Sequence, residues 1–227
     1  MVVGDGLIAR AFSRFRDDER VVVFASGVSN SLETDPERFS RERELLMRTR
    51  AENRGRLLVY FGTCSVEDPE RRHTPYVSHK LALEQALAAS PGPWLVLRLP
   101  LAVGRAQRGA TLAQFLHDRI VNGERFEVWR HATRYPIDVE DAARIAERFM
   151  RDATMWNRTI NVALRAFPVI DFVHALERIL GQRASYAVVE KGAHYEVSCP
   201  EVAQLAQELG LDFSDQYLDR VLRKYFG

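Results

Sequence analysis

The sequence predicts an α/β fold in which helices cover both faces of a doubly wound parallel sheet. Two observations lead to this prediction. Short β-branched and aliphatic runs alternate along the chain with longer segments of helical spacing, as strands and crossover helices do in such a fold. The runs over 20–26, 56–63 and 94–104 are almost continuously apolar, which is typical of strands buried on both faces.

The first half of the chain supplies most of the predicted sheet. The helix after the second strand begins with the cap candidate Asp35, and Pro36 follows at the first helical position. In order, strands are predicted over 1–4, 20–26, 56–63 and 94–104, and helices over 7–15, 35–53 and 75–90.

The pattern of strand-like and helix-like segments changes after Gly104, and the second half of the sequence predicts a smaller α/β lobe. We therefore divide the chain into a cofactor-binding core over 1–104 and a mainly substrate-binding lobe over 105–227, from which about 135–165 returns to the core sheet. The cap candidates here are Asp138 or an adjacent acid, Ser198 and Ser214. Helices are predicted over 111–123, 138–152, 168–181, 198–211 and 214–226, and strands over 126–130, 159–164 and 185–190.

Composition excludes several classes of protein. The 227 residues are 46% hydrophobic, and 32 basic residues face 31 acidic ones, so neither a nucleic-acid stripe nor a membrane-surface patch is expected. No apolar run approaches the ~20 residues of a membrane span, and no basic leader precedes the first apolar residues. Cys64 and Cys199 are too few for a disulfide framework or a zinc cluster. We expect a cytoplasmic protein that binds no metal.

Tyr76 and Lys80 are the first candidates for chemistry. They stand four residues apart near the start of the predicted helix over 75–90, so they share one helix face. An ammonium beside a phenol favours the phenolate, which predicts a lowered pKa for Tyr76 and a role in proton transfer. Thr63 and Ser65 emerge at the end of the preceding strand, at the sheet edge where α/β folds place their ligands.

A glycine turn joins the first strand to the first helix. Gly4 and Gly6 permit a tight turn and a close approach of the backbone to a pyrophosphate. Such a turn is often only a loop, and its position between strand and helix strengthens the functional interpretation.

In combination, these motifs resemble those of the extended short-chain dehydrogenase/reductases, a family of nucleotide-sugar epimerases, dehydratases and ketoreductases with a Rossmann-like core. The similar segments occur in the family's order along nearly the whole chain. They are "GDGLIA", "VVVFASG", "YFGTCSVED", "YVSHK", "LRLPLAVG", "RYPIDVEDAA" and "TINVAL".

The resemblance implies NAD or NADP along the carboxyl edge of the sheet, with Tyr76 as acid/base, Lys80 on the nicotinamide ribose and Thr63 on the substrate oxygen. Arg134 matches the position that commonly holds the diphosphate of a sugar nucleotide. The implied cofactor contacts are Gly4, Gly6, Leu7, Ile8, Ala25, Ser26, Gly27, Tyr76, Lys80, Leu99 and Pro100, and the implied substrate contacts are Thr63, Cys64, Ser65, Leu101 and Arg134.

The chain departs from the family pattern in three places. Val3 stands where the first glycine is usual, and the interval before the strand over 20–26 is too short for two further strands and a helix, so NAD and NADP cannot be told apart. Cys64 and Ser65 replace the Asp and Glu of dehydratases, which disfavours dehydration. Leu101 replaces an asparagine that often contacts the diphosphate.

The leading prediction is an NAD(P)H-dependent 4-ketoreductase for a keto-sugar nucleotide, in deoxysugar or surface-polysaccharide biosynthesis. A nucleotide-sugar 4-epimerase with bound NAD is the nearest alternative, and a nucleotide-binding or scaffold protein without turnover is the second. By analogy, the family also implies a homodimer through the helical segments over 35–53 and 77–90.

Overall fold

Five parallel strands form the main sheet of the computed structural model, which describes residues 1–105 and 111–227. The strand order is β1-β2-β3-β4-β9, and every neighbouring pair is parallel. The strands are β1 (Val2–Val3), β2 (Val21–Phe24), β3 (Leu57–Thr63), β4 (Trp94–Leu99) and β9 (Arg158–Asn161). The predicted α/β class is confirmed, and β1 is an edge strand of this sheet.

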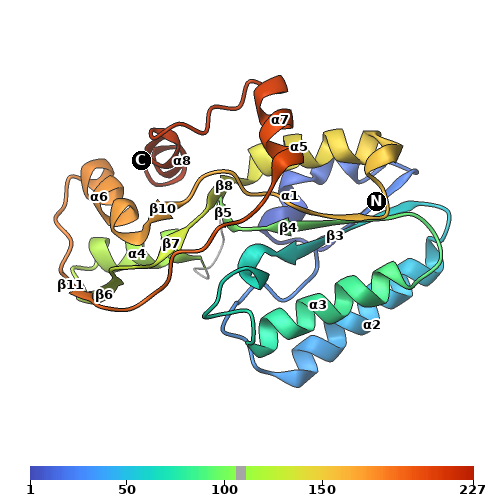
Figure 1. Ribbon diagram of the computed structural model, residues 1–227, viewed down its shortest axis with the longest axis horizontal. Helices are drawn as coiled ribbons and strands as arrows, with labels where there is room; N and C mark the ends of the chain where they lie inside the picture. Colours follow the sequence, from blue (N-terminus) through green and yellow to red (C-terminus); the bar gives the residue numbers. More distant parts are fainter. Residues whose placement is uncertain (106–110) are drawn as a thin grey trace.

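Helices cover the sheet on both faces. The helices α2 (Pro36–Glu52) and α3 (Pro75–Ala88) lie side by side on one face, and α1 (Leu7–Ala11) and α5 (Val139–Arg151) lie on the other (Figure 1). Side chains of β3 alternate between the two layers: Leu57, Val59 and Phe61 join the core under α5, whereas Leu58 and Tyr60 join the core under α2 and α3. This period of two explains why the strand is apolar throughout.

Proline 100 divides the strand predicted over 94–104. The chain leaves the main sheet after Leu99, and β5 (Leu101–Val103) pairs instead with β8 (Pro136–Asp138) in a separate two-stranded sheet. Proline has no N–H to give to a sheet ladder, so it is a natural point for the chain to change sheets. At this point the chain passes from the main sheet towards the second lobe.

The second lobe is built on its own apolar core. Helices α6 and α8 pack against each other there, and two small sheets pair β6 with β11 and β7 with β10 (Figure 1). Its elements are α4 (Leu112–Val121), β6 (Phe126–Trp129), β7 (Thr133–Arg134), β10 (Phe167–Pro168), α6 (Val169–Leu180), β11 (Tyr186–Val189) and α8 (Tyr217–Phe226). Three short 3₁₀ helices complete the chain: η1 (Ser13–Phe15), η2 (Cys64–Val66) and η3 (Ala153–Met155).

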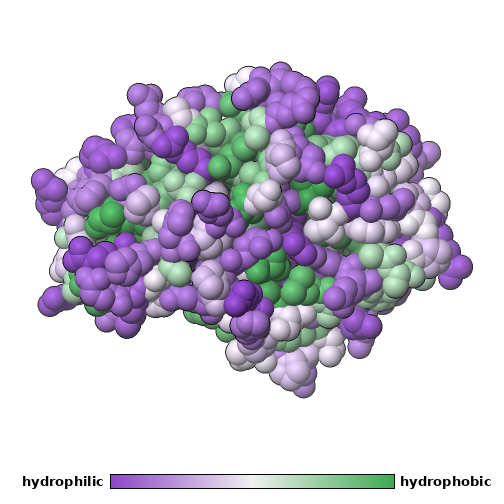
Figure 2. Space-filling view, viewed as in Figure 1, coloured by the Kyte–Doolittle hydropathy of each residue, from purple (hydrophilic) through white to green (hydrophobic). Residues whose placement is uncertain are grey.

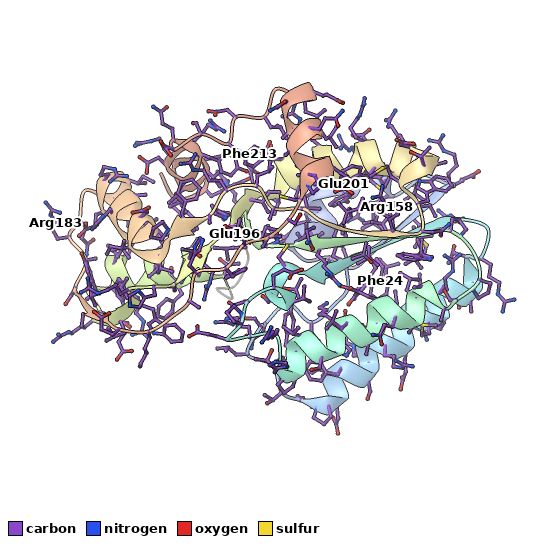
Figure 3. All side chains as sticks on the ribbon, viewed as in Figure 1. Phe24, Arg158, Arg183, Glu196, Glu201 and Phe213 are labelled. Carbon is purple, nitrogen blue, oxygen red and sulfur yellow. The ribbon has the colours of Figure 1, made fainter. Side chains whose placement is uncertain are left out.

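Two C-terminal helices make contacts with the first lobe. Asp138 caps α5, as predicted, and its carboxylate also accepts hydrogen bonds from Lys224 Nζ and the Tyr225 hydroxyl of α8, both at 2.7 Å. Helix α7 (Pro200–Glu208) is tied to β9 by an ion pair of 2.7 Å between Arg158 and Glu201 (Figure 3). These contacts hold the lobes together.

Of the other cap predictions, one holds and two are wrong. Asp35 caps α2 by accepting a hydrogen bond from the Glu37 amide. Helix α7 begins after Cys199 and α8 after Gln216, and neither of these residues makes a side-chain cap. Ser214 lies too far upstream and instead accepts a hydrogen bond from the Gln216 amide. Both helices are held by packing of their apolar faces.

The two turn glycines lead to a stability prediction. Gly4 has a φ of +116°, and a Cβ there would lie 2.5 Å from the Ala25 carbonyl oxygen, whereas a Cβ on Gly6 would meet nothing within 4 Å. We expect Gly4→Ala to lower the free energy of unfolding by about 1–3 kcal/mol. The control Gly6→Ala should cost less than about 1 kcal/mol. Urea unfolding measures both, and equal losses would contradict the prediction.

Candidate active site

Thr63, Tyr76 and Lys80 meet at the carboxyl end of the main sheet. Thr63 is the last residue of β3, and the other two lie on the first turns of α3. All three are buried, with 6%, 7% and 4% of their surfaces exposed. Lys80 Nζ lies 5.8 Å from the centre of the Tyr76 ring. The structure therefore brings together the three residues that the sequence predicted as catalytic.

Local sequence fixes how α3 presents this pair. Thr74 caps the helix by accepting a hydrogen bond from the Val77 amide, and Pro75 occupies the first helical position. Leu83 and Leu87 continue the buried face that begins with Tyr76 and Lys80, and both leucines are fully buried. The apolar part of the face anchors α3 on the sheet, which holds the polar part at the sheet edge.

A buried carboxylate that sequence reasoning missed completes the site. Glu42 of α2 is only 3% exposed, and its carboxylate accepts hydrogen bonds from Lys80 Nζ (2.8 Å), the Tyr60 hydroxyl (3.0 Å) and the Val28 amide (2.8 Å). His79 Nε2 lies 3.0 Å from the same carboxylate. Burial alone would raise the pKa of Glu42, but the hydrogen bonds and the ammonium lower it to about 2.

The predicted lowering of the Tyr76 pKa is wrong. Burial raises the pKa of Tyr76 to about 12, the charge of Glu42 adds to the rise, and a hydrogen bond from Thr63 opposes it. The Lys80 ammonium, which the sequence placed beside a lone phenol, is paired with Glu42 instead. Burial lowers the pKa of Lys80, and Glu42 opposes this change. Tyr76 is consequently a neutral phenol at physiological pH.

The predicted cofactor contacts lie around the ends of β1 and β2. At Gly4 the backbone passes too close to Ala25 for a Cβ to fit. Gly6 precedes Leu7 and Ile8 of α1 and faces open space. Ser26 follows Ala25 and is half-buried.

Gly27, another predicted cofactor contact, lies against the buried ion pair. A Cβ there would be 2.5 Å from Glu42 Oε1 and 2.9 Å from Lys80 Nζ. A glycine at this position leaves the space that the pair occupies.

The remaining predicted contacts are partly or fully buried. Cys64 donates a hydrogen bond to the Arg98 carbonyl oxygen, and burial raises the pKa of its thiol, so it is a core residue and no nucleophile. Ser65 is half-buried and donates its amide to Thr63 Oγ1 at 3.1 Å. Leu99 is buried, and Pro100 and Leu101 are half-buried at the crossing between sheets.

Arg134 extends from the second lobe towards the loop that follows β3. Its guanidinium lies 3.9 Å from the buried Asp68 carboxylate, which Arg71 approaches at the same distance. Burial lowers the pKa of Arg134, and the neighbouring charge of Arg71 lowers it further. Arg71 and Asp68 were missed, because an arginine-rich sequence gives no sign of which charges converge.

The low pKa of Glu42 predicts an acid-dependent loss of stability. Because folding depresses this pKa from 4.5 to about 2, the contribution is complete above pH 4.5 and disappears as the pH falls towards 2. Its size is on the order of 3 kcal/mol. Urea unfolding of native protein and Glu42→Gln should differ most at pH 7, and the difference should shrink at pH 3. A difference independent of pH would contradict this.

No protein-family model matches the sequence, and no curated protein does. Solved structures do match the fold. The UDP-glucose 4-epimerase of Thermotoga maritima, solved with UDP-glucose, is 18% identical, with a TM-score of 0.72 over 96% of this chain and 80% of that one. The Thermus thermophilus UDP-glucose 4-epimerase, solved with NAD, is 19% identical, with a TM-score of 0.67 over 95% and 78%.

A third similar structure is a Pseudomonas aeruginosa protein named RMD, solved with NADPH. It is 16% identical, with a TM-score of 0.66 over 92% of this chain and 80% of that one. At these identities the likeness establishes architecture, which confirms the predicted resemblance at the level of the fold. The chain shares the Rossmann-like α/β fold of these structures.

Proposed function

We propose that this protein is an NAD(P)H-dependent ketoreductase that acts on a keto-sugar nucleotide, with Tyr76 as the proton donor. The observation that carries the proposal is the buried, neutral Tyr76 phenol beside Thr63 at the carboxyl edge of the sheet. A group that keeps its proton at neutral pH suits donation to a forming alkoxide, whose basicity exceeds its own. The biological setting we propose is deoxysugar or surface-polysaccharide biosynthesis.

The residues at the sheet edge fit a nicotinamide dinucleotide. The space above Gly6 is open, and Lys80 has ammonium protons beyond the one given to Glu42. Two of the similar structures were solved with NAD or NADPH, which supports this cofactor class. Gly6 and the first residues of α1 would face its phosphates, and Lys80 its nicotinamide ribose. When bound in reduced form, the cofactor supplies the hydride.

The protein's own part in the reaction is positioning and proton transfer. Thr63 would hydrogen-bond to the substrate carbonyl oxygen and hold it next to the Tyr76 hydroxyl. As the carbonyl carbon accepts hydride, that oxygen gains negative charge and takes the phenolic proton. The phenolate left behind lies beside Thr63, whose hydroxyl can turn to it once the product oxygen carries its proton.

Epimerisation is the second candidate, because two of the similar structures are UDP-glucose 4-epimerases. An epimerase begins by removing a proton from a sugar hydroxyl, which requires a base. Burial and the Glu42 charge both raise the pKa of Tyr76, so they disfavour the phenolate that would serve as this base. This observation favours the reductase.

Removing the Tyr76 hydroxyl tests the proposal directly. We expect Tyr76→Phe to lower kcat by about 10²–10⁴-fold, the usual contribution of a general acid, and to leave NAD(P)H binding nearly unchanged. The measurement is the absorbance of NAD(P)H at 340 nm with a panel of 4-keto sugar nucleotides. Tyr186→Phe, which removes a hydroxyl near His174 in the second lobe, is the matched control and should leave kcat unchanged.

The outcomes separate the three candidate functions. Consumption of NAD(P)H by native protein and its loss in Tyr76→Phe support the reductase. Conversion of a UDP-sugar to its 4-epimer without net consumption, by protein purified with bound NAD, would instead establish the epimerase. Binding of dinucleotide with no turnover of any panel member by native protein would leave the scaffold function.

Arg134 provides a test of the substrate class. If its guanidinium holds the diphosphate, Arg134→Gln should raise the KM for the sugar nucleotide about tenfold or more and leave the Kd for NAD(P)H unchanged. Arg178→Gln, which breaks an exposed ion pair with Asp219, is the matched control. Equal KM values for native protein and Arg134→Gln would show that the phosphates are held elsewhere.

The implied homodimer also belongs to the proposal. Among the described residues, the exposed large hydrophobic side chains are Leu32, Phe115, Val121 and Val188, and none lies on α2 or α3. On the face seen in Figure 2, hydrophobic residues reach the surface only in small separate areas. A dimer through α2 and α3 would therefore use a polar interface, and light scattering at several concentrations tests for it.

A further inference from the structure

Four groups from three parts of the chain converge on one carboxylate beneath the candidate site. Glu42 of α2 contacts Tyr60 of β3, His79 and Lys80 of α3, and the Val28 amide in the loop after β2. The Glu42 and Lys80 side chains are 2% and 5% exposed, and that of His79 is 9% exposed. His79 stacks on Phe39 with ring centres 4.5 Å apart, which closes the cluster towards solvent.

Stability alone is a weak explanation for this arrangement. A buried ion pair contributes little net free energy, because the cost of removing both charges from water offsets their attraction. Here the pair also requires a glycine at position 27, since any Cβ would collide with Glu42 and Lys80. The positive member of the pair is the lysine that the proposed function places on the cofactor.

We propose that Glu42 is a positioning residue: it fixes the Lys80 ammonium beneath the nicotinamide end of the dinucleotide and cancels the charge that Lys80 would otherwise exert on Tyr76. This inference rests on the proposed function, which places Lys80 on the cofactor. It assigns Glu42 no contact with substrate or cofactor, so Glu42 acts only through Lys80 and Tyr76.

The charged and titratable groups around the pair are few. Glu42 faces Tyr60, Tyr76, His79 and Lys80. Lys80 also feels Glu84 of its own helix, whose carboxylate is already paired with Arg98 at 2.7 Å. Glu84 is as buried as Glu42 but does not bind Lys80, which makes Glu84→Gln a matched control for the loss of a buried ion pair.

A double-mutant cycle tests whether Glu42 acts through Lys80. We expect Glu42→Gln to weaken NADH or NADPH binding about tenfold, measured by the fluorescence of the dinucleotide, and Glu84→Gln to leave it unchanged. In the Lys80→Met background, Glu42→Gln should have no further effect, because the group that it positions is gone. Additive effects, or equal losses in both glutamine variants, would overturn the proposal.

Titration of Tyr76 tests the same role without turnover or cofactor. Tyrosinate absorbance at 295 nm is compared between Glu42→Gln and the double variant with Tyr76→Phe, so that the difference reports Tyr76 alone. Loss of the carboxylate removes a negative charge that raises the pKa of Tyr76, so the midpoint should fall by about one pH unit relative to native protein. An unchanged or higher midpoint would overturn the proposal.

The two measurements distinguish failure of this inference from failure of the proposed function. If native protein neither binds nor oxidises NAD(P)H, the proposed function fails, and the Tyr76 titration still decides the role of Glu42. Should Glu42→Gln not fold, Glu42→Asp replaces it in the binding experiment. The shorter side chain keeps the charge and moves it away from Lys80, so dinucleotide binding should weaken, and an undiminished affinity would overturn the proposal.

Discussion

A buried ammonium needs a buried counter-charge, and this constraint organises the candidate site. Lys80 is placed at the sheet edge by the apolar face of α3, out of contact with water. Glu42 supplies the missing charge from α2, 38 residues away in sequence. Because an unpaired charge in this environment would cost several kcal/mol, the two helices must keep their relative position for the site to exist. Gly27 and Tyr60 take their places around the pair.

Much of the architecture was predictable because its causes are local. Continuous apolar runs identify doubly buried strands, and β2 and β3 are buried at every residue. Asp35 and Asp138 cap the helices that follow them, since a short carboxylate before a helix finds a free amide wherever the chain goes. Tyr76 and Lys80 share a face because spacing of four residues guarantees it in any helix.

The unpredicted features depend on contacts between distant segments. Glu42 stands in a run of alternating charges, "RERE", and its spacing from Leu46 puts it on the buried face of α2, but a charged residue gave no reason to expect burial there. Only the packing of α2 against α3 selects it. Burial, with the Glu42 charge as a smaller addition, reverses the expected pKa shift of Tyr76, which was predicted from the Lys80 pair in isolation. Pro100 carried a local signal for the break after Leu99, but the apolar run around it was the stronger pattern.

Because the main sheet ends at β1, a fixed position of Lys80 would matter more for binding a dinucleotide. In the described part of the chain, no strand lies beyond β1, so a dinucleotide at this edge would find less protein on its adenine side. Helix α1 beside it spans only Leu7–Ala11. Binding free energy lost on the adenine side would have to come from contacts at the nicotinamide end. Side chains that are already held in place contribute most there, because binding does not have to order them. A lysine held by a buried carboxylate is such a group. If the proposed function holds, the Glu42–Lys80 pair would offset part of the binding free energy lost on the adenine side.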